Sequence, residues 1–164
     1  MKKKVLIGIM IVTAVLFSAK PALGIKTYTI TGLNMLPSLE SGELVVIDER
    51  VYKDEPISRG DVVAFMDPRG SGRVFIERVV GLPGEIIEIR NGIVFIDEKQ
   101  LTEDYVDSRR KERDISQKFP QMKVPQNMFF LLGDNRDNSV DSRLFGAVRM
   151  ENIIGKMILS SEGD

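Results

Sequence analysis

The hydrophobic pattern divides the chain into an apolar N-terminal segment and a longer part made of short alternating runs. Residues 5–19 are almost continuously apolar, and three lysines precede them. Positive charge before an apolar stretch is typical of a segment that keeps its N-terminus inside and exports the following chain. We therefore expect residues 1–25 to form a membrane anchor and residues 26–164 to form one extracytoplasmic domain.

This N-terminal segment also permits a second interpretation. The apolar run is shorter than the roughly twenty residues that usually cross a bilayer, although residues 21–25 lengthen it if Lys20 reaches the interface. Ala22, Leu23 and Gly24 form a small-x-small pattern, which is typical of signal-peptide cleavage. We prefer the retained anchor, and both interpretations place the rest of the chain on the extracytoplasmic side of the membrane.

From residue 26 onward, the pattern indicates a mainly β fold. Short runs rich in β-branched residues alternate with turn residues, and no helical period is visible. The best-supported hairpin lies at Asn91 and Gly92, because this pair favours a tight turn between two alternating runs. The predicted strands are residues 27–31, 43–48, 61–65, 73–80, 85–90, 93–97, 128–132 and 152–159.

A charge-rich stretch at residues 97–126 interrupts this rhythm and contains little apolar material. We interpret it as an insertion lobe or a mobile loop of the domain. Its basic run at residues 109–113 is a weak candidate for a binding patch, because acidic residues are interleaved with the basic ones.

Composition and charge exclude several classes of site. The chain contains no cysteine and no histidine, so disulfides, thiolate nucleophiles, Ser-His-Asp triads and histidine-ligated zinc are excluded. Asp137, Ser139 and Asp141 are spaced like the start of a calcium loop, but Val148 stands at the twelfth position and cannot ligate. We expect neither metal nor cofactor. The net charge of -1 also gives no electrostatic reason to expect nucleic acid as a partner.

The candidate chemistry lies in three segments that are rich in polar and turn residues, at 32–39, 75–85 and 133–143. In the second segment, the strand period of two places Glu77 on the same face as Phe75. Arg78 then points to the opposite face. One of these two charges is therefore expected among apolar side chains. Burial without a cation predicts a raised pKa for Glu77, whereas pairing with an arginine predicts a lowered pKa.

Taken together, these segments resemble the type I signal peptidase family. The matching boxes are residues 34–39, 59–63, 77–85 and 133–143, followed by Phe145 and Gly146. The resemblance implies a membrane-anchored sheet or barrel core that binds the extended C-terminal part of a signal peptide. It assigns Gly32, Leu33, Asn34, Met35, Leu36, Phe75 and Glu77 to the substrate groove. It also makes Asp134, Asn135, Ser139, Asp141 and Arg143 members of a structural loop, with Asp141 and Arg143 as a stabilising pair.

The sequence departs from the family at the positions of the catalytic serine and lysine. The resemblance places Asn34 at the serine position and Glu77 at the lysine position. An amide is not a useful nucleophile for peptide carbonyls, and a carboxylate without a hydroxyl to deprotonate completes no dyad. We interpret Ser38 and Ser139 as framework residues, and we expect Glu77 to pair with Arg78, Arg143 or Asn34.

Three functions remain open at this point. The leading hypothesis is a non-enzymatic signal-peptidase-like protein that binds extended segments of exported or surface proteins at the membrane. It would act as a chaperone or assembly factor, and the resemblance suggests the assembly of Gram-positive surface appendages such as pili. The first alternative is an active signal peptidase that uses other residues. The second is a peptidase in which Glu77 and Asn34 activate water.

Overall fold

The computed structural model describes residues 24–106 and 118–161. The predicted anchor at residues 1–25 therefore lies outside the described residues, except for Gly24 and Ile25. Ile25 is the first residue of strand β1 (Ile25–Thr29), and the predicted boundary between anchor and domain stays a prediction. Within the described ranges, no helix combines the length and the apolar character that crossing a bilayer requires.

The larger of two sheets contains seven strands, and all of its pairings are antiparallel. The alternating or continuous apolar runs predicted from the sequence form most of these strands, with ends shifted by a few residues. The strand order is β1 (Ile25–Thr29), β2 (Leu44–Asp48), β11 (Ile153–Ser160), β3 (Val62–Met66), β4 (Val74–Gly81), β9 (Met128–Leu132) and β10 (Val148–Arg149). The prediction of a mainly β fold is confirmed.

The smaller sheet contains four antiparallel strands in the order β7 (Lys99–Gln100), β6 (Ile93–Ile96), β5 (Ile86–Arg90) and β8 (Lys118–Lys123). The predicted hairpin joins β5 to β6, with Arg90 opposite Ile93. Asn91 and Gly92 have φ values of 49° and 77°, which is the left-handed conformation that this tight turn requires. The hairpin prediction is confirmed.

The charge-rich stretch at residues 97–126 is more structured than predicted. It supplies β7 and β8, and β8 pairs with β5 along the edge of the smaller sheet. Phe119 and Met122 on β8 pack against the core of this sheet, and Val124 is fully buried in it. These separated apolar residues form no long run in the sequence, so strand β8 was not predicted, and the interpretation of the stretch as an insertion lobe stays a prediction. The basic run at 109–113 lies outside the described residues.

Short helices connect the strands of the larger sheet. They are α1 (Val51–Asp54), η1 (Arg136–Asn138), α3 (Ser142–Phe145) and η2 (Met150–Asn152). Asp141 is the N-cap of α3, because its carboxylate accepts a hydrogen bond from the backbone N–H of Arg143.

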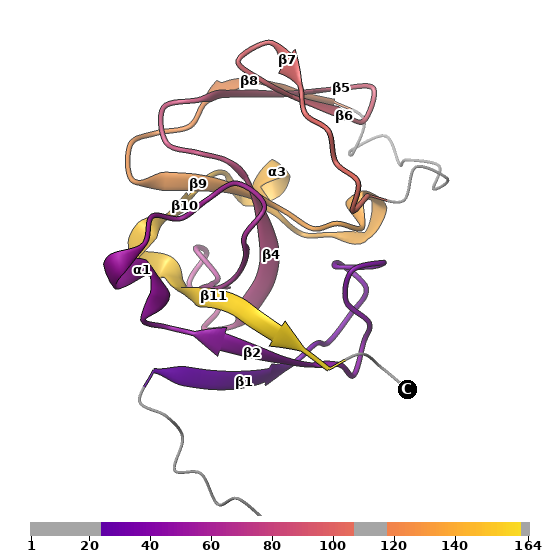
Figure 1. Cartoon of the computed structure of the whole chain (residues 1–164). Coiled ribbons are helices and arrows are strands. Elements are labelled where there is room, and N and C mark those ends of the chain that lie inside the picture. The colour runs from indigo at the N-terminus through magenta and orange to yellow at the C-terminus, as the bar shows by residue number, and fades with distance from the viewer. Residues whose placement is uncertain (1–23, 107–117, 162–164) are drawn as a thin grey trace, which may run out of the picture.

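Strand β4 is central to the packing of the domain. Figure 1 shows β4 running between the end of the fold that holds β1, β2 and β11 and the end that holds β5 to β8. Three of its buried residues belong to three different hydrophobic clusters: Ile76, Val79 and Val80. A side chain on β4 is therefore held in place by most of the domain, which is a rigid position for a functional group.

Candidate functional site

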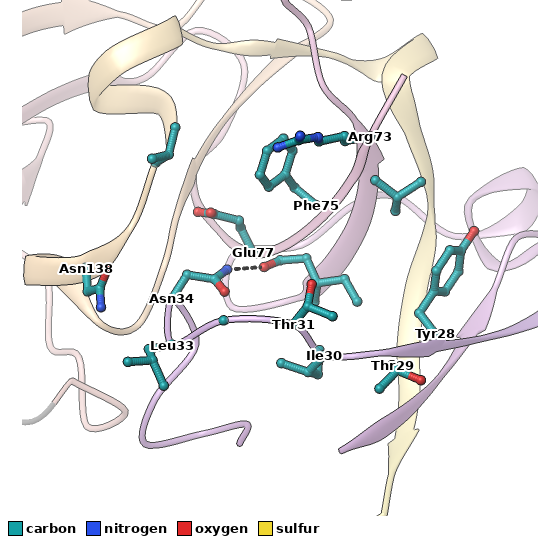
Figure 2. Close-up of a pocket in the computed structure, with 14 residues that line it drawn as sticks. Tyr28, Thr29, Ile30, Thr31, Leu33, Asn34, Arg73, Phe75, Glu77 and Asn138 are labelled. Atoms are coloured by element: carbon teal, nitrogen blue, oxygen red, sulfur yellow. Dashed lines mark hydrogen bonds between the residues drawn. The ribbon is translucent and has the colours of Figure 1, made fainter. Parts of the chain in front are cut away.

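A groove of about 340 Å³ lies between the chain segment that follows β1 and the first half of β4. Figure 2 shows its walls, with Tyr28 and Thr29 from β1 on one side and Phe75 and Glu77 from β4 on the other. The loop after β9 closes the groove through Asn138. The lining residues are Tyr28, Thr29, Ile30, Thr31, Gly32, Leu33, Asn34, Arg73, Val74, Phe75, Ile76, Glu77, Asn138 and Val140.

Most of the predicted groove residues line this groove, namely Gly32, Leu33, Asn34, Phe75 and Glu77. The prediction was wrong for the next two residues of the bend. Met35 has no exposed surface and packs in the hydrophobic cluster that includes Leu39. The turn in which Met35 O accepts a hydrogen bond from Leu39 N directs this side chain inward. Leu36 is half-buried and is not among the lining residues.

The sequence prediction did not include several polar groove residues, among them Thr31, Arg73 and Asn138. The strand period of two could have placed one of them, Arg73, in the groove. Arg73 and Phe75 are two residues apart on one extended run, so they lie on the same face. Asn138 belongs to the polar loop that the sequence had singled out, but only the folded chain brings this loop to the groove.

The wall formed by β4 has an unpaired edge. Strand β3 pairs with β4 from Val74 to Arg78, whereas β9 pairs with β4 only from Arg78 onward. Among the described residues, the Val74–Glu77 half of β4 therefore has no strand neighbour on its β9 side. Backbone groups of alternate residues point to the same edge of a strand, so the backbone groups of Val74 and Ile76 share this edge.

Asn34 lies beside this free edge. Its side-chain amide donates a hydrogen bond of 2.9 Å to the backbone carbonyl of Ile76, as Figure 2 shows. The backbone carbonyl of Asn34 accepts a hydrogen bond of 2.9 Å from the backbone N–H of Asn135. A Cβ atom on Gly133 would lie 2.6 Å from this same carbonyl, so only glycine permits the loop to approach Asn34 so closely.

Glu77 occupies the floor of the groove and has no exposed surface. Burial raises the pKa of its carboxyl well above the ordinary value, and the nearby charge of Asp141 adds to this rise. Hydrogen bonds from Ser139 and Asn34 and the charge of Arg143 oppose the rise but do not cancel it. The Ser139 hydroxyl is 3.1 Å from Glu77 Oε1, and Oε2 has no hydrogen-bond partner among the described residues.

The two arginines expected as partners of Glu77 pair elsewhere. Arg143 forms a buried ion pair of 2.6 Å with Asp141, which confirms the predicted loop-stabilising pair. Arg78 forms an ion pair of 2.6 Å with Asp134 on the opposite face of β4. The predicted pairing of Glu77 with either arginine was therefore wrong, and the Asn34 amide, which donates its 2.9 Å hydrogen bond to the Ile76 carbonyl, only opposes the rise in the pKa of Glu77.

The loop at residues 133–143 is hydrogen-bonded to the residues around the groove floor. Asp134 also accepts a hydrogen bond of 2.5 Å from Ser38, and the Asn135 amide donates a bond of 2.7 Å to the Leu33 carbonyl. The loop also contacts the segment that follows β7, because Arg136 forms an ion pair of 2.6 Å with Glu103. The bend at residues 32–39 is thus held by this loop at two points, Leu33 and Ser38.

The chemistry that this arrangement permits is limited by its side chains. The floor offers an amide, a buried carboxyl and one hydroxyl that is already hydrogen-bonded to that carboxyl. Within the part of the chain that the structure describes, no lysine lines the groove, and no three carboxylates converge as a metal site would require. The groove is therefore suited to holding an extended chain through backbone pairing and apolar contact.

Known proteins with similar sequences are signal peptidases. A protein of Synechocystis named probable signal peptidase I-1 is 36% identical over 129 residues, which cover 74% of this chain and 63% of that protein. Signal peptidase I U of Bacillus subtilis is 32% identical over 160 residues, covering 94% of this chain and 84% of that protein. The chain thus spans less than two thirds of the length of the Synechocystis protein.

Structural and family comparisons agree with these relatives. A crystal structure of a signal peptidase I from Enterococcus faecalis V583 matches with a TM-score of 0.55 and 35% identity. The match covers 62% of this chain and 97% of that one. The sequence profile of the family described as "Signal peptidase, peptidase S26" matches residues 2–161. The chain therefore belongs to the signal peptidase family, peptidase S26.

Proposed function

We propose that this protein binds extended segments of exported or surface proteins in the groove between the 30–34 segment and β4, and releases them uncleaved. It would act as a chaperone or assembly factor on the extracytoplasmic side of the membrane, held there by the predicted N-terminal anchor. The observation that carries this proposal is the pair of side chains at the groove floor, where Asn34 and Glu77 meet.

The free edge of β4 supports the binding step. An added strand would find the backbone groups of Val74 exposed on this edge, while Asn34 already occupies the Ile76 carbonyl. Apolar contact is available from Leu33, which is 47% exposed, and from Val140, which is 43% exposed. Backbone pairing combined with alternating side-chain contacts is the usual way in which a sheet edge captures an extended peptide.

The chemistry of the floor supports release without cleavage. The Asn34 amide is not a nucleophile for peptide carbonyls, and its nitrogen is engaged with Ile76. Burial raises the pKa of Glu77, which favours the uncharged acid, and an uncharged acid cannot accept a proton from water or from a hydroxyl. The complex would therefore end by dissociation.

A membrane anchor would strengthen such weak binding. Tethering the domain to the membrane from which its clients emerge raises their effective concentration near the groove. Binding does not need the serine or the lysine of the peptidase reaction, so this function is compatible with their replacement. Assembly of surface appendages such as pili is one setting in which retention of an exported chain would be useful.

Cleavage of preproteins is the second candidate function, and the names of the relatives favour it over a chaperone role. The candidate nucleophile for cleavage is the hydroxyl of Ser139, which lies 3.1 Å from Glu77 Oε1. Ser139 itself is not among the residues that line the groove, and its neighbour Glu77 has a raised pKa. These two facts support the proposal of binding without cleavage.

One experiment tests both functions on the full-length protein in detergent or lipid. A fluorescent peptide that spans the end of a signal peptide and the start of the mature chain is incubated with the protein and, in parallel, with a Ser-Lys signal peptidase. We expect binding by anisotropy and no cleavage by mass spectrometry. Cleavage that Ser139→Ala or Glu77→Gln abolishes would establish the peptidase and overturn the proposal.

Matched surface variants locate the binding. Leu33→Asn combined with Val140→Asn removes apolar contacts of the groove, and we expect about tenfold weaker binding, a change of about 1.4 kcal/mol. Leu144→Asn combined with Ile93→Asn alters residues of similar exposure outside the groove and should bind as the wild type does. Equal binding by both double variants would place the peptide elsewhere.

A further inference from the structure

We propose that Arg73 selects client segments that carry a carboxylate, an aspartate or a glutamate side chain, at the position that docks beside it in the groove. This inference rests on the proposed binding function and adds a preference within it. It begins from the charges that line the groove. Of the lining residues in the described chain, only Arg73 and Glu77 belong to the classes Asp, Glu, Lys and Arg.

Arg73 differs from every other arginine that the structure describes. Each of the others forms an ion pair with a carboxylate, as Arg69 does with Asp67 and Arg78 does with Asp134. The side chain of Arg73 has no such partner within the described ranges. Only its backbone is engaged, since its N–H donates to the Ser71 hydroxyl and its carbonyl accepts from Asp67 N–H.

The position of Arg73 suits contact with a bound strand. It directly precedes Val74, the first residue of β4, whose backbone lies on the free edge of that strand. Figure 2 shows its side chain on the same wall as Phe75. A guanidinium presents several donors in a fixed planar arrangement, so it can hold a carboxylate through two hydrogen bonds at once. An extended client paired with this edge would pass its side chains close to that group.

Among the described residues that line the groove, no other exposed charged side chain competes with Arg73. Glu77 has no exposed surface, and burial with the nearby Asp141 raises its pKa and favours the uncharged acid. The remaining polar lining is neutral, from residues such as Thr31 and Asn138. The groove therefore carries a net positive charge at its open side, which attracts acidic segments and disfavours basic ones.

The test uses peptides on the full-length protein. A neutral extended peptide that binds is substituted with aspartate at each successive position, and the same series is made with asparagine and with lysine. Anisotropy gives the dissociation constant of each peptide at low and at high salt. We expect one position at which aspartate binds about fivefold more tightly than asparagine and lysine binds more weakly, with the difference shrinking at high salt.

Variants of Arg73 assign the preference to its side chain. Arg73→Gln should lose the aspartate preference, measured within the variant as the ratio of its affinities for the aspartate and asparagine peptides, and Arg73→Glu should prefer lysine at the same position. Both keep the backbone hydrogen bonds that fix residue 73. Arg149→Gln is the matched control, because Arg149 is exposed and lies outside the groove; it should retain the preference.

The outcomes separate this inference from the function on which it rests. If peptides bind but aspartate has no advantage at any position, or if Arg73→Gln keeps that advantage, the selection by Arg73 is overturned and the binding function stands. If no peptide of any series binds, both are overturned.

Discussion

Two neighbouring regions around β4 treat buried carboxyl groups in opposite ways. The loop at 133–143 supplies Asp134 and Asp141, and each forms an ion pair with an arginine. At the groove floor, Glu77 is equally buried but has no arginine of its own. The loop therefore compensates its buried carboxyl groups with guanidinium partners, whereas the floor favours an uncharged acid. Buried acidic residues thus occur both in the supporting loop and at the groove floor, but those of the loop have arginine partners and Glu77 has none among the described residues.

The loss of an arginine from the loop should have the largest effect. Arg143→Met leaves Asp141 buried without its cation, and we expect a loss of about 3–5 kcal/mol in the free energy of unfolding. The pKa of Glu77 should rise further, because Arg143 opposes its rise in the native protein. Urea unfolding measures the stability, and NMR titration measures the carboxyl.

The control for this change is Arg149→Met. Arg149 is exposed and forms an ion pair of 3.4 Å with Glu151, so its loss should change stability by no more than about 0.5 kcal/mol. Similar losses in the free energy of unfolding for the two variants would mean that the buried ion pair stabilises the protein no more than the exposed one does.

Neutralising Glu77 should have an intermediate effect that depends on pH. Its pKa in the folded protein is raised above the unfolded value. Below the unfolded pKa both states bind the proton, and the stability that Glu77 contributes is lost as pH rises through the folded pKa. Glu77→Gln should therefore match the wild type near pH 4 and exceed its stability by about 1–3 kcal/mol near pH 9.

Urea unfolding at acidic, neutral and basic pH checks this divergence. Glu151→Gln, at an exposed position, should leave the difference from the wild type small at all pH values. A Glu77→Gln variant that is less stable than the wild type at basic pH would mean that the carboxylate is favourably charged in the fold. The groove floor would then resemble the loop, and the contrast between the two regions would fail.

The smallest expected effect concerns the hydrogen bond that Asn34 makes across the groove floor. Asn34→Ala removes the donor to the Ile76 carbonyl, and we expect a loss of about 0.5–1.5 kcal/mol. Asn152→Ala is the control, because its amide makes only an exposed contact of 3.5 Å with the Met66 carbonyl. Thermal unfolding of both variants compares them, and an Asn34→Ala variant as stable as the control would show that this bond adds nothing to the floor.

Local patterns predicted the strands well because each strand shows its own period. The runs that became β4 and β9 were visible without knowledge of their partners, and the turn at Asn91 and Gly92 needs only its own backbone geometry. Strand β8 was missed because its apolar residues, Phe119 and Met122, are separated by Pro120 and Gln121, which breaks the strand period of two. Its pairing with β5 provides the context that the run itself lacks.

The candidate site was predicted in part for the same reason. Alternation placed Glu77 and Phe75 on one face of β4, and the structure confirms that both line the groove. The bend at residues 32–39 has no such period, so Met35 could not be recognised as a core residue before its turn was known.

The sequence by itself determined the β-rich class, most strands, the hairpin and the residue types at positions 34 and 77, because all of these are local properties of the chain. Only the tertiary structure decided which charges meet. It paired Arg78 with Asp134 and Arg143 with Asp141, and within the described ranges it left Glu77 without an ion-pairing arginine and Arg73 without a carboxylate. Ion pairing depends on distances between segments that are far apart in sequence, and burial sets the cost of each charge that remains alone.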